Sequence, residues 1–216
     1  MSKKGFVNII LIVVVVAIII AGGYFIMSKR QTPINQGQEP PALAQVSDWK
    51  KYTNEKYGFE ISYPPSGEFY DGEQDRQKIS ALPHNIFYPC DPRDIVACLY
   101  FPSKSYTDTN LEGAAVAISV IKRFDTEAKC VGTVIPKKQI DNITFSETAG
   151  GIFKSSGHES KDWMYRTLHE QGCLEIILRI NTTDLAYSTN TKISRVNESS
   201  VLALLNSVLS TFKFLH

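Results

Sequence analysis

The feature that most constrains this chain is an apolar run of 22 residues near its N-terminus, which extends from Phe6 to Met27 without a charged side chain. As a helix that rises about 1.5 Å per residue, this run would span roughly 33 Å, enough to cross a hydrocarbon core about 30 Å thick. A helix in a globular core usually has a polar face, and this run has only Asn8 as a strongly polar member. The sequence therefore predicts a transmembrane anchor over residues 1–30.

A cleaved secretory signal is one alternative to a retained anchor. Lys3 and Lys4 would form its basic start, and Ala21-Gly22-Gly23 would provide small residues for cleavage. However, the apolar run is longer than a signal core of about 7–15 residues, and Lys29-Arg30 follows it like a stop-transfer signal. We therefore expect a single-pass protein of the cell membrane, with a short cytoplasmic tail and an extracytoplasmic C-terminal domain.

A pilin-like filament subunit is a second alternative. Lys4-Gly5-Phe6 resembles the processing site of type IV prepilins, where a basic-Gly-Phe junction precedes a hydrophobic helix. The resemblance is confined to residues 1–27. Major pilins have a Glu shortly after this junction, where the present sequence has Ile10. Pilin helices also continue beyond the membrane, whereas Pro33 and Pro40-Pro41 would break this one.

The rest of the chain divides into a linker and one domain. Residues 31–48 are rich in Gln, Pro and Gly and lack periodic apolar spacing, which is typical of a flexible tether. Residues 49–216 suit a single domain, since one hydrophobic core typically holds roughly 100–200 residues. Lys and Arg number 23 against 22 Asp and Glu, so no excess charge would attract nucleic acid.

Period-two apolar patterns predict β-strands in this domain. A half-buried strand is expected over residues 59–63 and a second strand over 116–124. A hairpin is expected over 163–180 with Gln171-Gly172 as its loop, which would place Glu170 opposite Cys173. In this register one hairpin face is continuously apolar. Its residues are Trp163, Tyr165, Thr167, His169, Leu174, Ile176, Leu178 and Ile180.

The other face of the hairpin is predicted to be semi-apolar, because it holds Met164, Leu168 and Ile177. Arg166 would lie diagonal to Glu175 on this face and form a modest ion pair. An amphipathic helix near the C-terminus is the candidate to cover it. The apolar residues of this helix, behind the candidate N-caps Asn197 and Ser199, are Val201, Leu204, Leu205, Val208 and Phe212. These elements predict an α+β fold, an antiparallel β-sheet flanked by helices.

The two ends of the domain contain short motifs that resemble bacterial PsbP-like domains. These motifs are Tyr52-Thr53-Asn54, Tyr57-Gly58-Phe59, Ile61-Ser62-Tyr63-Pro64, Leu204-Leu205 and Ser210-Thr211-Phe212-Lys213-Phe214. The segment from Asp71 to Glu112 departs from the pattern. The resemblance implies an antiparallel sheet flanked by helices, in an exported or anchored protein that binds partners instead of catalysing a reaction.

Four cysteines lie beyond the apolar run, at Cys90, Cys98, Cys130 and Cys173. An exported domain would oxidise them, and sequence order suggests the structural disulfides Cys90–Cys98 and Cys130–Cys173 among the alternative pairings. Free buried thiols are a second alternative. The spacings do not match the closely spaced ligands of a zinc site, so we expect no metal.

Histidines and clustered acids are weak site candidates. We expect His84 to lie in a surface loop, His158 to be solvated and His169 to be structural, none of them a ligand. Three acids alternate as in a calcium loop but lack the Gly and Glu of an EF-hand, so they predict a charged, solvated turn. They are Asp71, Glu73 and Asp75.

The sequence contains no nucleophile elbow, phosphate loop, dinucleotide fingerprint or H-E-x-x-H motif. We therefore expect a membrane-tethered extracytoplasmic interaction domain that is not an enzyme and has no cofactor. It would be anchored through residues 6–27 and would bind a protein or another component of the cell envelope. An enzyme with a dispersed active site and the pilin-like subunit are the alternatives.

Overall fold

The computed structural model describes residues 48–83, 87–91, 95–132, 136–170, 172–188 and 192–215. The predicted anchor, nearly all of the predicted linker and His84 lie outside these ranges. Within them, no helix is both long enough and apolar enough to cross a membrane. The anchor, the linker and the membrane topology therefore stay predictions.

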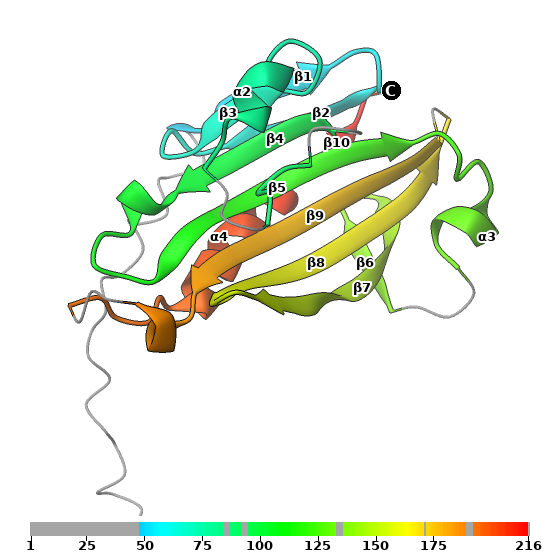
Figure 1. Cartoon of the computed structure of the whole chain (residues 1–216). Coiled ribbons are helices and arrows are strands. Elements are labelled where there is room, and N and C mark those ends of the chain that lie inside the picture. The colour runs from blue at the N-terminus through cyan, green and yellow to red at the C-terminus, as the bar shows by residue number, and fades with distance from the viewer. Residues whose placement is uncertain are drawn as a thin grey trace, which may run out of the picture. The chain divides into compact units, whose positions relative to one another are not determined.

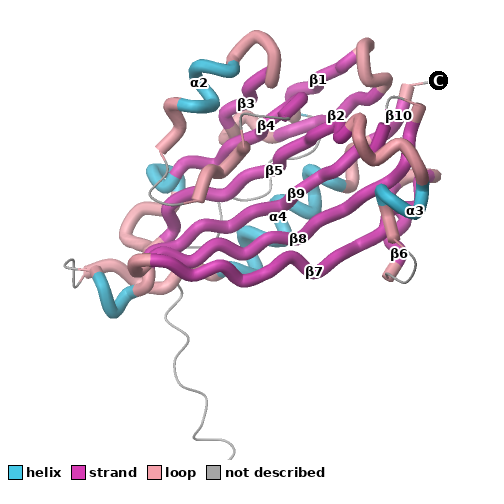
Figure 2. The backbone as a smooth tube through the Cα atoms, turned by 45° about the vertical axis from the view of Figure 1, so that its right-hand side comes forward, coloured by secondary structure: helices cyan, strands magenta, loops and turns pink. Residues whose placement is uncertain are grey.

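A seven-stranded antiparallel sheet forms the framework of the domain, as Figure 1 and Figure 2 show. In spatial order its strands are β3 (Glu68–Asp71), β4 (Ile95–Pro102), β5 (Leu111–Ile121), β9 (Gly172–Thr183), β8 (His158–His169), β7 (Ile143–Ser155) and β6 (Lys137–Ile140). The long strands β5, β9 and β8 lie next to one another, and each is hydrogen-bonded on both sides. The predicted antiparallel sheet is confirmed.

A smaller sheet joins the two ends of the domain. It consists of β1 (Lys50–Asn54), β2 (Phe59–Tyr63) and β10 (Lys213–Phe214), with β2 in the middle. The rings of Phe59 and Phe212 stack beneath it with 5.4 Å between their centroids. The predicted strand over residues 59–63 is confirmed.

The C-terminal helix α4 (Glu198–Leu209) packs against one face of the main sheet (Figure 1). Asn197 caps it as predicted, since its side chain accepts a hydrogen bond from the Ser200 N–H at 3.2 Å. The buried residues of the helix are Val201, Leu204, Leu205, Val208 and Leu209. They share the core with Tyr165, Leu174, Ile176, Leu178 and Ile180 of β8 and β9. In the described ranges the other α-helices are short, with α2 (Arg76–Ser80) next to β3 and α3 (Glu127–Cys130) next to β8. The 3-10 helices η2 (Ser103–Ser105) and η3 (Leu185–Tyr187) are also short.

The face that α4 covers is the opposite of the one we predicted. The helix lies on the continuously apolar face, whereas Ile177 on the other face packs with α2 and the loop around Cys90. The physical reason is that the Leu and Ile side chains of β9 remove more apolar area from water against α4 than the mixed face would. Leu168 on the mixed face is accordingly still 39% exposed.

The second predicted strand and the hairpin register also need correction. β5 ends at Ile121, short of the expected boundary, because the chain turns there and the Phe124 N–H bonds to the Ile121 carbonyl at 3.1 Å. In the β8–β9 hairpin, Leu168 rather than Glu170 pairs with Cys173. This register differs from the predicted one by two residues, and a shift of two keeps every side chain on its predicted face.

Truncation of Leu205 should destabilise the domain strongly. Leu205 is fully buried between α4 and the sheet, so L205A would lose packing and leave a cavity. We expect the free energy of unfolding to fall by about 2–5 kcal/mol, measured by urea denaturation. Ala203 lies on the exposed side of the same helix. A203Q should change this free energy by less than about 0.5 kcal/mol, and equal effects of the two substitutions would contradict the packing of α4.

Candidate functional site

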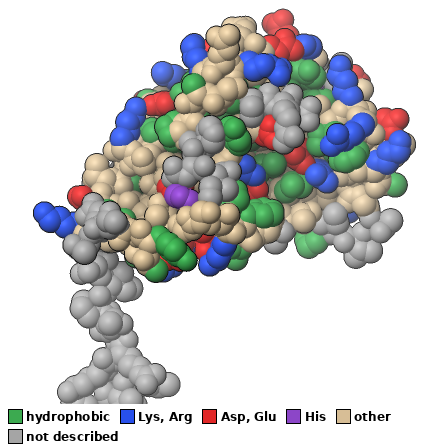
Figure 3. Space-filling view, in the orientation of Figure 1, with side chains coloured by type: hydrophobic (Ala, Val, Ile, Leu, Met, Phe, Trp, Pro, Cys, Tyr) green, Lys and Arg blue, Asp and Glu red, His purple; other side chains and the backbone are tan. Residues whose placement is uncertain are grey.

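The face of the main sheet opposite α4 carries the candidate site. Strand pairing aligns the side chains of β5, β9 and β8 in rows across this face. The rows are Ala115–Arg179–Asp162, Ala117–Ile177–Met164, Ser119–Glu175–Arg166 and Ile121–Cys173–Leu168. Figure 3 views the molecule from this side, and basic, acidic and apolar side chains are intermingled on its surface.

A groove of about 560 Å³ lies over these rows, and we call it the sheet groove. Its floor includes Ala117, Ile177 and Met164. Two segments border it near opposite ends of the strands. The first wall is residues 87–91, of which Pro89 and Asp91 line the groove, and the second wall is residues 122–130, of which Arg123 and Phe124 line it.

A disulfide fastens the first wall to the sheet. Cys90 in the wall is bonded to Cys98 of β4, and both residues are buried. Cys98 pairs with Ala117 of β5 in the strand register, which places its side chain on the groove face. The wall therefore cannot leave the sheet without breaking a covalent bond.

Arg179 adds a polar connection between the floor and the same wall. Its guanidinium donates two hydrogen bonds to the Asp162 carboxylate, one of them from Nε at 2.7 Å, and a third from Nη1 to the Tyr88 carbonyl. The Asp162 side chain is only 6% exposed. Because a nearly buried carboxylate is costly to leave unpaired, this pair holds its geometry firmly.

The second wall is fastened in the same way. Cys130, the last residue of α3, is bonded to Cys173 of β9, and both are buried. On the floor, Arg166 donates from Nε to the Glu175 carboxylate at 2.6 Å. The Arg166 guanidinium also lies 5.6 Å from the centroid of the Phe124 ring in this wall. Both predicted disulfides are confirmed, and each connects one wall to the floor or edge of the groove face.

A second hollow, of about 350 Å³, continues from the sheet groove. The two share Ile95, Ile121 and Arg123 as lining residues, so these residues form the passage between them. Lys122 lines the second hollow. Lys122 and Arg123 are both exposed, and in the part of the chain that the structure describes neither has an ion-pair partner.

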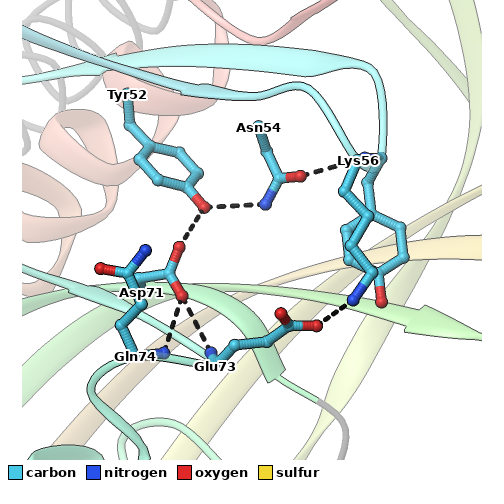
Figure 4. A network of polar contacts seen from close by, with 7 residues as sticks. Tyr52, Asn54, Lys56, Asp71, Glu73 and Gln74 are labelled. Atoms are coloured by element: carbon cyan, nitrogen blue, oxygen red, sulfur yellow. Dashed lines mark hydrogen bonds and ion pairs between the residues drawn. The ribbon is translucent and has the colours of Figure 1, made fainter.

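A polar network beside the second hollow holds the turn after β3, as Figure 4 shows. The Asp71 carboxylate accepts hydrogen bonds from the Tyr52 hydroxyl at 2.7 Å and from the Glu73 and Gln74 N–H groups at 2.9 and 3.0 Å. Burial by itself would raise the pKa of Asp71, but these hydrogen bonds outweigh it and the pKa is lowered. Burial and the bond to Asp71 raise the pKa of Tyr52.

The three acids predicted to form a charged turn are all engaged by other groups of the protein. Glu73 pairs with Lys56, and Asp75 accepts a hydrogen bond from Lys78 Nζ at 2.6 Å. Asp71 is occupied as described above. In the described ranges, no group of three or more His, Cys, Asp or Glu side chains is arranged to hold a metal ion.

The structure corrects one of the histidine predictions. His158, which we expected to be solvated, contacts the Glu112 carboxylate through Nδ1, and its side chain is only 20% exposed. Glu112 also accepts a hydrogen bond from the Thr183 hydroxyl. His169 stacks on Phe214 with 3.8 Å between ring centroids, which fits its expected structural role.

The sequence predicts the Arg166–Glu175 ion pair, which the structure confirms, but it does not identify Arg123, Phe124 and Arg179 as groove residues. The sequence pattern places Arg123 and Phe124 in a strand, and the predicted hairpin register places Arg179 opposite Met164 instead of Asp162. The Arg179–Asp162 pairing is the signal that would have revealed the site, because two opposite charges in one row of a sheet are complementary.

No protein-family model matches this chain, and no curated protein matches it. Among solved structures, the chain is similar to cyanobacterial PsbP (CyanoP) from Synechocystis sp. PCC 6803. The TM-score is 0.40 with 14% sequence identity, over 79% of this chain and 95% of that chain. A similarity this distant assigns neither a family nor a function.

Removal of either disulfide should lower stability, and the loss should be greater for the disulfide that closes the longer loop. The sequence separations are 43 for Cys130–Cys173 and 8 for Cys90–Cys98. We expect losses of about 4 kcal/mol for C130S/C173S and about 2.6 kcal/mol for C90S/C98S in urea denaturation.

The oxidation state of the cysteines can be measured directly. Alkylation of the protein in native membranes before and after reduction, read by mass, should find all four cysteines protected until the reductant is added. Free thiols before reduction would contradict the two disulfides.

The Asp71 network should make stability depend on pH in the acid range. Because the folded-state pKa of Asp71 lies below its unfolded value near 3.9, the carboxylate stabilises the fold above that pH, and the contribution is lost as pH falls through the folded pKa. D71N should therefore lose less stability than the parent protein between about pH 5 and pH 2. The control is D141N, at an exposed turn residue, which should lose stability with falling pH as the parent protein does. If D71N and the parent lost stability in parallel, the contribution of Asp71 to the pH dependence would be refuted.

Proposed function

We propose that this protein is a membrane-tethered interaction module, and that its sheet groove binds a partner in the cell envelope. The single observation that carries the proposal is an open sheet face bordered by two walls, each fastened by its own disulfide. A surface that is already rigid loses little conformational entropy on binding, so its contacts contribute more fully to affinity.

The lining of the groove supports binding more than catalysis. Glu175 on its floor and Asp162 next to the lining residue Arg179 are already paired with arginines, which leaves neither carboxylate free to act as an acid or base. Arginine, methionine and aromatic side chains such as Arg123, Met164 and Phe124 are the types enriched at protein interfaces. The groove therefore suits a macromolecular partner.

The proposed membrane anchor and the proposed extracytoplasmic location of the domain are supported by different observations. Residues 6–27 have the length and composition of a membrane span. The two disulfides suit an oxidising compartment, which favours an extracytoplasmic domain. Together they support a binding domain held near the outer surface of the membrane.

Photocrosslinking in intact cells tests the proposed function. A photoreactive amino acid in place of Ser119, on the groove floor, should yield a discrete adduct in the membrane fraction. The matched control places it at Lys50, an exposed residue of the small sheet. Binding in the groove would be refuted if position 119 gave no adduct, or if positions 119 and 50 gave the same adducts. A thiol count on each variant checks that both disulfides are still formed.

A further inference from the structure

We propose that the segment docked in the sheet groove is an acidic peptide in an extended conformation. An apolar side chain of the peptide lies on the row of Ala117, Ile177 and Met164, and its carboxylates bind Lys122 and Arg123 at the end of β5. This inference rests on the proposed function, because it names the chemistry of the occupant of the same groove.

Charge is the first argument for an acidic occupant. Glu175 on the floor and Asp162 next to it are neutralised by their arginine partners, so they do not repel an incoming carboxylate strongly. The remaining acid of the groove lining, Asp91, lies in the first wall, and Glu73 in the second hollow is paired with Lys56. Lys122 and Arg123 have no ion-pair partner in the described ranges, and the surface between the two hollows therefore favours anions.

The side chain of Arg123 is placed to receive a carboxylate. Its guanidinium lies 5.2 Å from the centroid of the Phe124 ring, which the Arg166 guanidinium approaches from the floor. The ring thus supports Arg123 on a wall that the Cys130–Cys173 disulfide fastens. A supported guanidinium can present two parallel N–H donors to a carboxylate, the geometry in which such pairs are strongest.

The strand geometry sets the spacing of the peptide. Ala117, in the apolar row, and Ile121, where β5 ends, are separated by about 14 Å at roughly 3.4 Å per residue. An extended peptide advances by the same distance per residue. The apolar side chain and the first carboxylate of the occupant should therefore be about four residues apart.

The recessed floor distinguishes a peptide from a membrane surface. Anionic lipid headgroups would satisfy Lys122 and Arg123, but a flat bilayer would not reach the apolar row between the two walls. A peptide engages both features at once. The requirement for an apolar residue at a defined spacing is thus the property that separates these two occupants.

Fluorescence anisotropy on the full-length chain in a neutral detergent tests the proposal. The probes are fluorescein-labelled peptides in which a Leu and a Glu-Glu pair are separated by one to five Ser residues. We expect the tightest binding with about three intervening Ser residues. Replacing Glu-Glu with Gln-Gln, or Leu with Ser, should weaken binding by at least about tenfold.

Charge reversal supplies the matched variants. K122E/R123E should weaken binding of the best peptide by at least about tenfold. K50E/K137E makes the same change in net charge at exposed sites outside the groove and should change affinity by less than about twofold. Circular dichroism and the thiol count establish that both variants remain folded.

Several results would overturn the inference. These are equal binding of the Gln-Gln peptide, no dependence on spacing, or no effect of K122E/R123E. Binding to phosphatidylserine vesicles that K122E/R123E abolishes, without any peptide binding, would assign these cations to a membrane surface. The photocrosslinking experiment separates the two proposals. If the adduct formed from position 119 persists unchanged in K122E/R123E, the acidic occupant is refuted while the proposed function stands. If that adduct is absent in the parent protein, the proposed function itself is refuted.

Discussion

β9 lies between β5 and β8, and its antiparallel register with both strands sorts its side chains onto two faces of the sheet. Leu174, Ile176 and Leu178 point toward α4 and form the centre of the core. The alternate residues, Glu175 and Arg179 among them, point to the opposite face and meet their charge partners in β8. A slip of one residue would exchange these sets, placing charges in the core and the aliphatic side chains outside.

The groove face is bordered by loops and the short helices α2 and α3 in place of a second helix layer. Loops have backbone polar groups and few apolar side chains, so they bury less area than a helix and hold a sheet less tightly. In this domain two disulfides compensate for that weakness, and two arginines link the floor to the loops through Tyr88 and Phe124. The result is a hollow with fixed borders.

The first wall belongs to the segment between β3 and β5. This segment contributes Cys90 and Cys98 to the groove face. It also contributes core residues to the face that α4 covers, among them Val96, Leu99 and Phe101 of β4. One stretch of chain therefore builds part of the core and part of the groove, because successive side chains of a strand lie on opposite faces of a sheet.

The sequence by itself determined the features that depend on local pattern: the strand over residues 59–63, the amphipathic helix with Asn197 as its cap and the apolar face of the β8–β9 hairpin. For the cysteines, sequence order only suggested the pairing that the structure has, with other pairings left open. Only the tertiary structure decided which sheet face α4 covers and which charges meet. Periodicity defines a face without saying what packs on it, and a register shift of two residues leaves that periodicity unchanged. The same shift places Arg179 opposite Asp162 instead of Met164, and for that physical reason the charge pairs of the groove face depend on the tertiary structure.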